Sequence, residues 1–372
     1  MGKIHVLDQN TINMIAAGEV VERPASVVKE LVENSIDAGA TKITVSIKNG
    51  GIDEITVTDN GQGISAEDAE LAFTQHATSK ITSASDLENI FTLGFRGEAL
   101  ASISSVSRVE LDTKTEATPA TKVVVENSQS GSKTSNKATT GTTISVFDLF
   151  RHIPARKKFL RTPATELSHV QEMFISLALV NLQVHFELIH NGKLLLRLPA
   201  VENFNERVFA IWNAQVAENL YESHVEIPGG KIHLYIGKPE AGRKDRKLQY
   251  LFVNKRHVSD RILSKAVIEG YTGFLPGGIY PVYFIMLELD PKVVDVNVHP
   301  RKLEVRFDNS GQIFGAVKNA VSQALTTNTK RDLMSRVSSG DRTSFSPIPD
   351  TPTFLPASGR RQQASVGKQS PA

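Results

Sequence analysis

The 372-residue chain contains no cysteine, which excludes disulfides and thiolate metal sites. It also lacks any run of roughly 20 apolar residues, the length that a membrane-spanning helix needs, although 40% of its residues are apolar. The N-terminus continues into polar residues and shows no apolar signal segment. These absences favour a globular protein, and we expect it to be cytoplasmic.

The chain has little net charge, +2 in total, but its two halves differ. Residues 1–150 hold 12 Lys and Arg against 20 Asp and Glu, whereas residues 151–372 hold 30 against 20. A basic half is typical of a protein with a polyanionic partner. Ordinary surface variation would explain the same imbalance, so charge alone leaves both interpretations open.

The length exceeds one ordinary hydrophobic core and predicts two domains with a tail. We expect a first domain over residues 1–205 and a second over residues 206–330. Beyond residue 330, Ser, Pro, Thr, Gln and Arg dominate and apolar periodicity disappears. We expect residues 331–372 to be a disordered linker.

Apolar periodicity predicts a mixed α/β fold in both halves. Pro24 is expected to open a helix that ends near Gly39. Helices are also expected at 65–76, after Gly97, and at 166–180, 259–270 and 310–326. Strands are expected at 43–47, 55–57, 106–113, 121–126, 144–147, 183–198, 231–237, 248–253, 282–289 and 302–307, with an exposed hairpin loop at 127–141.

The first long helix has an unusual polar face. On a helical wheel, Glu30, Glu33, Asn34 and Asp37 cluster, and the pattern places no Lys or Arg among them. An amphipathic helix packed on a sheet would also have a polar face. However, a divalent cation would relieve the repulsion, and Asn, Asp and Glu oxygens suit Mg²⁺. A spare carboxylate one turn away could then deprotonate an attacking water.

A loop follows the second expected strand, with Asp59 at the strand end and Gly61 and Gly63 after it. Glycines let a flat ligand approach the backbone, and a carboxylate can accept a hydrogen bond from the exocyclic amine of adenine. The same Asp-x-Gly-x-Gly spacing is also common in ordinary turns.

Two further segments contain residues that suit phosphate. Thr78-Ser79-Lys80 precedes Gly94-Phe95-Arg96-Gly97-Glu98-Ala99-Leu100, where glycines open a helix and leave backbone N–H groups available for anions. The sequence contains neither a Gly-x-x-x-x-Gly-Lys-Ser/Thr loop nor a Gly-x-Gly-x-x-Gly loop. A mobile glycine-rich lid would show the same pattern.

The order of these motifs, followed by Gly141-Thr142-Thr143, resembles the GHKL ATPases, which include gyrase B subunits, heat-shock chaperones, histidine kinases and MutL proteins. The similarity to the MutL mismatch-repair family is closer and spans residues 1 to about 330. It is carried by residues 13–25, 94–100, 154–160 (Pro-Ala-Arg-Lys-Lys-Phe-Leu) and 295–300 (Asp-Val-Asn-Val-His-Pro).

The resemblance implies a GHKL ATPase domain of α/β sandwich type, followed by a ribosomal-S5-like α/β domain. It implies ATP and Mg²⁺ as cofactors, with Glu30 as the general base, Asn34 as the metal ligand and Asp59 as the adenine-binding carboxylate. Lys302 of the second domain is implied to reach the γ-phosphate. The remaining residues implied to contact nucleotide are Gly61, Gly63, Thr78, Ser79, Lys80, Gly94, Phe95, Arg96, Gly97, Glu98, Ala99, Leu100 and Thr143.

Basic residues in the second half are candidates for DNA contacts, because sparse aromatics and no base-reading motif favour phosphate binding without sequence preference. These candidates are Arg156, Lys157, Arg256, Arg261 and Lys265. The resemblance implies that Arg261 lies in a DNA-holding groove. The others are equally interpretable as solvated surface residues.

The resemblance therefore implies a weak ATPase that dimerises on ATP binding, holds DNA and couples a MutS-type mismatch sensor to a downstream nuclease or helicase near the nucleoid. No nuclease activity is expected from these residues. A histidine kinase would need a phosphoacceptor helix before the ATP domain, and a topoisomerase would need a tyrosine nucleophile domain. Both interpretations are disfavoured because neither feature is recognised in the sequence. A DNA-binding scaffold with an inactive ATP site is disfavoured because Glu30 and Asn34 are both present.

Overall fold

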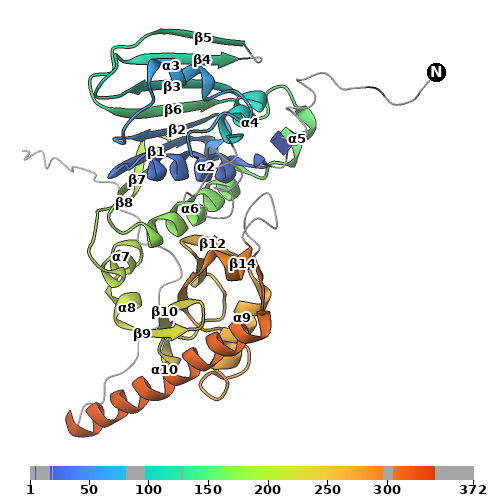
Figure 1. Ribbon diagram of the computed structural model, residues 1–372. Helices are drawn as coiled ribbons and strands as arrows, with labels where there is room; N and C mark the ends of the chain where they lie inside the picture. The colour runs from blue at the N-terminus through green and yellow to red at the C-terminus, as the bar shows by residue number, and fades with distance from the viewer. Residues whose placement is uncertain are drawn as a thin grey trace, which may run out of the picture.

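The computed structural model describes residue 5 and residues 17–18, 20–80, 97–126, 129–295 and 305–339. Two sheets of eight and five strands lie one above the other in Figure 1, with a short β14–β15 pair beside the second. Within these ranges no helix is both long and apolar enough to span a membrane.

The eight-stranded sheet has the order β5-β4-β3-β6-β2-β1-β7-β8. Only the β1–β7 pair within it is parallel, and the other neighbours are antiparallel. Its strands are β1 (Lys42–Lys48), β2 (Glu54–Asp59), β3 (Arg108–Lys114), β4 (Thr121–Glu126), β5 (Gln129–Thr134), β6 (Gly141–Phe147), β7 (His185–His190) and β8 (Lys193–Leu198).

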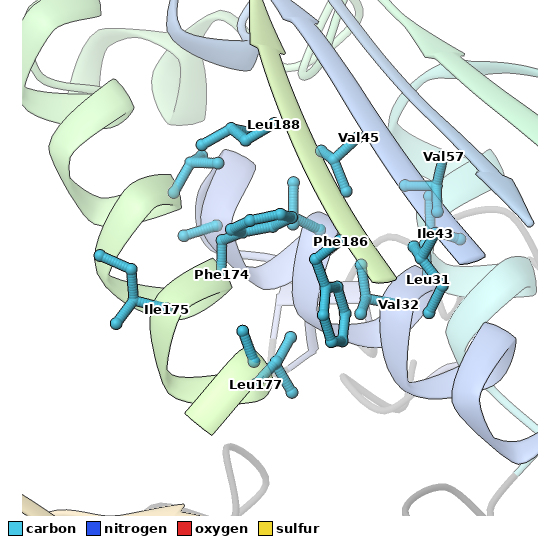
Figure 2. Close-up of a cluster of buried hydrophobic side chains, with 14 of the residues drawn as sticks. Leu31, Val32, Ile43, Val45, Val57, Phe174, Ile175, Leu177, Phe186 and Leu188 are labelled. Carbon is cyan, nitrogen blue, oxygen red and sulfur yellow. The ribbon is translucent and has the colours of Figure 1, made fainter. Parts of the chain in front are cut away.

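Two long helices, α2 (Pro24–Asp37) and α6 (Pro163–Val180), pack against this sheet (Figure 1). Each has Pro in its first turn, where the missing N–H costs nothing. Figure 2 shows Leu31 and Val32 of α2 and Phe174 of α6 meeting Phe186 of the sheet. Burying each such side chain stabilises the fold by roughly 1.5–3 kcal/mol, so the sheet fixes which face of α2 remains polar.

Shorter helices connect the strands of this sheet; below, the part of the molecule built on the eight-stranded sheet is called the first half and the part built on the five-stranded sheet the second half. They are α3 (Ala66–Leu71), α4 (Ala99–Val106) and α5 (Pro154–Phe159). Two more, α7 (Phe204–Ile211) and α8 (Ala214–Glu218), lead from β8 toward the second sheet.

The second sheet has the order β12-β11-β13-β10-β9, with β11 and β13 parallel. Helices α9 (Arg261–Gly270) and α10 (Ser310–Ser339) pack against it and against each other. Its strands are β9 (Leu220–Ile227), β10 (Gly230–Gly237), β11 (Gln249–Val253), β12 (Arg256–Val258) and β13 (Tyr283–Leu289), and β14 (Val294–Asp295) pairs with β15 (Arg306–Phe307).

The larger hydrophobic core continues from the first half into the second sheet. Phe204 of α7 stacks on Tyr235 of β10 with ring centroids 4.1 Å apart, and Trp212 lies 5.5 Å from Phe284 of β13. The two halves are therefore joined by packed aromatic side chains. The domain limits at residues 205 and 330 stay predictions.

The structure differs from the sequence-based expectation in several elements: β9, α5, α7 and α8 were not expected, and α3 ends earlier than residue 76. Two further differences concern the expected loop and the expected linker. Part of the expected loop at 127–141 forms β5, an edge strand whose side chains are all exposed and so carry no apolar alternation. Helix α10 extends to Ser339, beyond the expected end at 326, and therefore includes the first residues of the expected linker. Residues 340–372 lie outside the described residues.

Candidate functional site

Asp59 lies at the end of β2 and is 9% exposed. Its Oδ2 accepts a hydrogen bond from Ser35 Oγ of α2 at 2.8 Å. Its Oδ1 accepts from the backbone N–H groups of Gly61 at 2.9 Å and Thr142 at 3.2 Å. Buried polar groups need such partners, and here they hold the carboxylate in one orientation where α2, β2 and β6 meet.

The glycines around Asp59 are required by close backbone packing. A Cβ on Gly61 would lie 2.8 Å from the Ala38 carbonyl oxygen, and one on Gly63 would lie 2.1 Å from that of Lys114. Gly63 also has φ 76°, in the left-handed region that favours glycine. The spacing found in the sequence thus has a structural reason, and the approach of a ligand to this loop stays a prediction.

Asn34 and Asp37 of α2 share one cation. Lys80 Nζ donates to Asn34 Oδ1 at 2.8 Å and to Asp37 Oδ2 at 2.6 Å. Lys80 belongs to the expected phosphate-binding segment, where its backbone N–H bonds Thr78 Oγ1 and where Ser79 is exposed. Residues 34 and 80, far apart in sequence, are therefore in direct contact.

The expectation that no Lys or Arg accompanies the acidic face of α2 is wrong. Lys29 Nζ donates to Glu33 Oε2 at 2.9 Å and to Glu30 Oε1 at 3.3 Å. Burial is the largest influence on Lys29 and opposes its charge, but Glu33 and Glu30 together raise its pKa above the ordinary value. The helical wheel missed this pairing because it places side-chain origins, whereas a long lysine stem reaches across the face.

The residues just before Thr78-Ser79-Lys80 contact Gly97 and Glu98 of the second phosphate-suited segment. His76 N–H donates to the Gly97 carbonyl oxygen at 3.1 Å, and His76 Nδ1 lies 3.5 Å from Glu98 Oε1. Gly97 has φ 62°, and a Cβ there would lie 2.5 Å from the Ala77 carbonyl oxygen. Ala99 and Leu100 follow as the first turn of α4.

Thr143, on β6, directly follows Thr142, whose backbone N–H donates to Asp59. Its Oγ1 donates to Thr58 Oγ1 at 3.3 Å and accepts from Lys137 Nζ at 3.0 Å. Gly94, Phe95, Arg96 and Lys302 lie outside the described residues. Their predicted contacts with nucleotide stay predictions.

The basic residues predicted to contact DNA differ in their exposure. Arg261 and Lys265 are exposed on α9, and Lys157 is exposed on α5. Arg156 is half-buried and lies 5.9 Å over the Phe150 ring.

Arg256 at the start of β12 differs from the other basic candidates because it is only 9% exposed. It lines a small cavity together with Lys29 and Glu33 of α2. Burial lowers its pKa, although Glu33, Asp37 and Glu30 oppose that shift. Its assignment to a DNA surface is therefore corrected, because the guanidinium faces the acidic side of α2 rather than solvent. Composition alone could not reveal this.

The chain matches two protein-family models. Residues 22–152 match the histidine kinase-, DNA gyrase B- and HSP90-like ATPase family, and residues 208–326 match the DNA mismatch repair protein C-terminal domain family. The first match contains Glu30, Asn34, Asp59 and Lys80, and the second contains Arg256.

Several curated relatives are similar in sequence. The DNA mismatch repair protein MutL of Thermoanaerobacter pseudethanolicus is 44% identical over 326 residues, covering 87% of this chain and 53% of the relative. MutL of Agathobacter rectalis is 46% identical over 318 residues, covering 84% of this chain and 48% of the relative. The chain thus spans about half the length of the curated relatives that it matches.

Solved structures are similar as well. The N-terminal domain of a DNA repair protein matches with a TM-score of 0.73 and 27% identity, over 86% of this chain and 99% of that one. The Aquifex aeolicus MutL ATPase domain complexed with ADP matches with a TM-score of 0.56 and 30% identity, over 73% and 94%. The expected fold, an ATPase domain followed by a second α/β domain, is confirmed by these matches.

Proposed function

Because the chain belongs to the MutL family of DNA mismatch-repair proteins and carries a GHKL-type ATPase domain, we propose that it is an ATP-driven conformational switch. In this proposal it binds ATP, hydrolyses it slowly to ADP and phosphate, and dimerises in the ATP-bound form. The observation that carries the proposal is that α2 contacts both motifs: Ser35 donates to Asp59, and the neighbouring Asn34 accepts from Lys80.

Asp59 is the proposed adenine-reading group. Its Oδ2 accepts one hydrogen bond, from Ser35, among the described residues, and a carboxylate oxygen has room for a second donor. The ADP complex of the Aquifex aeolicus MutL ATPase domain supports a nucleotide at this kind of site. An adenine amine that donates to Asp59 would orient the triphosphate toward α2 and Lys80.

The donor set on α2 suits Mg²⁺. Asn34 supplies an amide oxygen and Asp37 a carboxylate oxygen, and both already hold the ammonium of Lys80, so this position attracts a cation. No group of three or more His, Cys, Asp and Glu in the described ranges is arranged to bind a metal. That agrees with Mg²⁺, which takes few protein ligands and completes its shell with water and phosphate. When bound, Mg²⁺ would neutralise charge on the triphosphate.

Glu30 is the proposed general base. It lies one turn before Asn34 on α2, and its side chain is 18% exposed. A carboxylate there can take a proton from a water that attacks the γ-phosphorus while the β–γ bond breaks. Lys29 Nζ donates to Glu30 Oε1 at 3.3 Å and so helps to hold this carboxylate in place. Lys302 is the proposed γ-phosphate partner from the second domain.

DNA is proposed to bind through exposed cations, with Arg261 at the start of α9 as the principal contact. Phosphate contacts of this kind carry no sequence information and weaken steeply with salt. Coupling to a MutS-type sensor and to a downstream nuclease or helicase is proposed from family membership. A cytoplasmic location near the nucleoid is proposed on the same basis.

ATP turnover in the parent chain and in Glu30→Ala tests this proposal. The variant should bind ATP with the parent's affinity but lose turnover, because the metal ligand Asn34 stays while the base is removed. Glu54→Ala serves as a control. Glu54, on β2, is also a carboxylate paired with a lysine, Lys48 of β1, but it lies away from Asn34. Parent-like hydrolysis by Glu30→Ala, or no hydrolysis by the parent, would contradict the proposal.

A further inference from the structure

The tip of the β11–β12 hairpin is a rigid two-residue turn. Asn254 and Lys255 both have positive φ, 48° and 65°, as a type I′ turn requires. A lysine with positive φ is strained, and it keeps this backbone conformation only where the surrounding structure holds it there. Asn254 provides that enforcement, since its side chain exchanges hydrogen bonds with the Leu289 backbone at 2.8 and 3.0 Å. The turn therefore holds the next residue, Arg256, in a fixed position.

Arg256 is directed at the nucleotide domain. It is 9% exposed, and it lines a small cavity with Lys29 and Glu33 of α2. The side of that cavity formed by α6 consists of Met173, Ser176 and Leu177, so the hairpin tip is packed against both long helices of the first half. The cavity is therefore a contact between the two halves of the molecule.

Charges on the two sides of this contact balance. The α2 side carries Glu30, Glu33 and Asp37, and the cations near them are Lys29, Lys80 and Arg256. A buried guanidinium without nearby anions is strongly destabilising. Arg256 and the acidic face of α2 thus stabilise each other only while the second sheet is docked on the first half.

Lys29 links this contact to the proposed base. Its ammonium donates to Glu33, which is 5% exposed, and to Glu30 at 3.3 Å. If Glu33 moved with Arg256, Lys29 would follow it and release or shift Glu30. The path from the hairpin to the base thus crosses two side chains, Glu33 and Lys29.

We propose that Arg256 is a positioning residue for ATP hydrolysis, which holds Glu33 and, through Glu33 and Lys29, sets the position of Glu30. Docking of the second domain then determines whether Glu30 is placed to take a proton from the attacking water. This effect is separate from any contact that the second domain makes with phosphate. The inference rests on the proposed ATPase function and assigns it a point of control.

The test compares ATP affinity and turnover in the parent chain, Arg256→Gln and Arg256→Lys. Misplacing a catalytic group by about 1 Å can cost up to ~100-fold in rate, so kcat of Arg256→Gln should fall roughly 10- to 100-fold. ATP Kd should stay within about two-fold, because the adenine site does not involve this residue. Arg256→Lys should restore part of kcat, since it keeps the charge.

The matched control is Arg243→Gln, which removes another buried arginine of the second domain. Arg243 is 7% exposed and pairs with Asp245 at 3.1 Å. This control should lower the Tm as Arg256→Gln does but leave kcat unchanged. Arg256→Gln combined with Glu33→Gln should lose little more than either single variant, because both interrupt the same path.

The outcomes separate the two proposals. A parent that binds but does not hydrolyse ATP overturns the ATPase function and this inference with it. A parent that hydrolyses ATP while Arg256→Gln turns over equally fast overturns the inference alone. Losses that match those of Arg243→Gln, affect Kd and kcat together, or add fully with Glu33→Gln would show that Arg256 only stabilises the fold.

Discussion

Asp59→Asn separates recognition of adenine from stability of the fold. The amide oxygen of the substituted side chain can still accept from Gly61 and Thr142, as Asp59 Oδ1 does. The amide nitrogen then faces Ser35 Oγ, which also has the Leu31 carbonyl oxygen as a hydrogen-bond acceptor at 3.1 Å. Ser35 can donate to Leu31 and accept from the new amide, so every buried polar group keeps a partner. The free energy of unfolding should therefore change by less than about 1 kcal/mol.

Nucleotide binding should change far more. The same amide points its second N–H toward the place proposed for the exocyclic amine of adenine, so two donors meet and an acceptor is lost. A hydrogen bond to a charged group contributes about 1.5–3 kcal/mol, which corresponds to roughly a 10- to 100-fold weaker Kd for ATP. GTP presents a carbonyl oxygen instead of the amine, so the preference for ATP over GTP should shrink or reverse.

Titration calorimetry with ATP and GTP on the parent, Asp59→Asn and Asp53→Asn provides the measurement. Asp53 is an exposed carboxylate in the turn before β2, where it accepts from Asn49 Nδ2 at 3.1 Å, and its substitution should leave both affinities unchanged. If Asp59→Asn binds ATP as tightly as the parent with an unaltered preference over GTP, the carboxylate does not read adenine.

Two further predictions concern the second half. Arg261→Glu should weaken DNA binding to every duplex alike and reduce its salt dependence, while the control Lys193→Glu, at the start of β8, should do neither. The fold should survive Arg261→Glu, because an acidic residue in the first turn of α9 suits the helix dipole. Fluorescence anisotropy at several salt concentrations provides the measurement, and a marked sequence preference would contradict phosphate binding. Burial lowers the pKa of His257 to about 4, so the unfolded chain binds a proton first and native stability should fall by on the order of 2 kcal/mol between about pH 6.5 and 4. His257→Phe should reduce that loss in denaturant titrations, and an identical pH slope in parent and variant would rule out His257 as its source.

Local patterns predicted the elements that position the site. Pro24, the apolar residues of α2 and the glycine at residue 39, with φ 73°, are sufficient to place that helix, and alternation at residues 43–47 and 55–57 places the neighbouring strands. Strand β5 was missed because none of its side chains is buried, and an edge strand paired on one side needs no apolar face. Strand formation there is determined by its neighbour β4, which no local pattern records.

The candidate site was predicted only in part, because local patterns identify motif residues but not the side chains that contact them. Motif order identified Asn34, Asp59 and Lys80, and in the structure Lys80 donates to Asn34 while Asp59 accepts from Ser35 of the same helix; their roles toward nucleotide stay predictions. The partners that hold them, Ser35 for Asp59 and Lys29 for Glu30, belong to no motif and emerge only from side-chain reach. Burial of Arg256 depends on how the two halves pack, so a basic residue in a basic region was assigned to the surface.

The central claim, that nucleotide drives a change of assembly, is tested most directly by sedimentation velocity on the 372-residue chain with and without a non-hydrolysable ATP analogue and Mg²⁺. We expect a monomer without the analogue and a dimer with it, because a ligand that binds the dimer-forming state more tightly shifts the population toward that state. Lys302→Ala should weaken the response while binding of the analogue persists. A parent chain that remains monomeric at tens of micromolar with saturating analogue would contradict the switch.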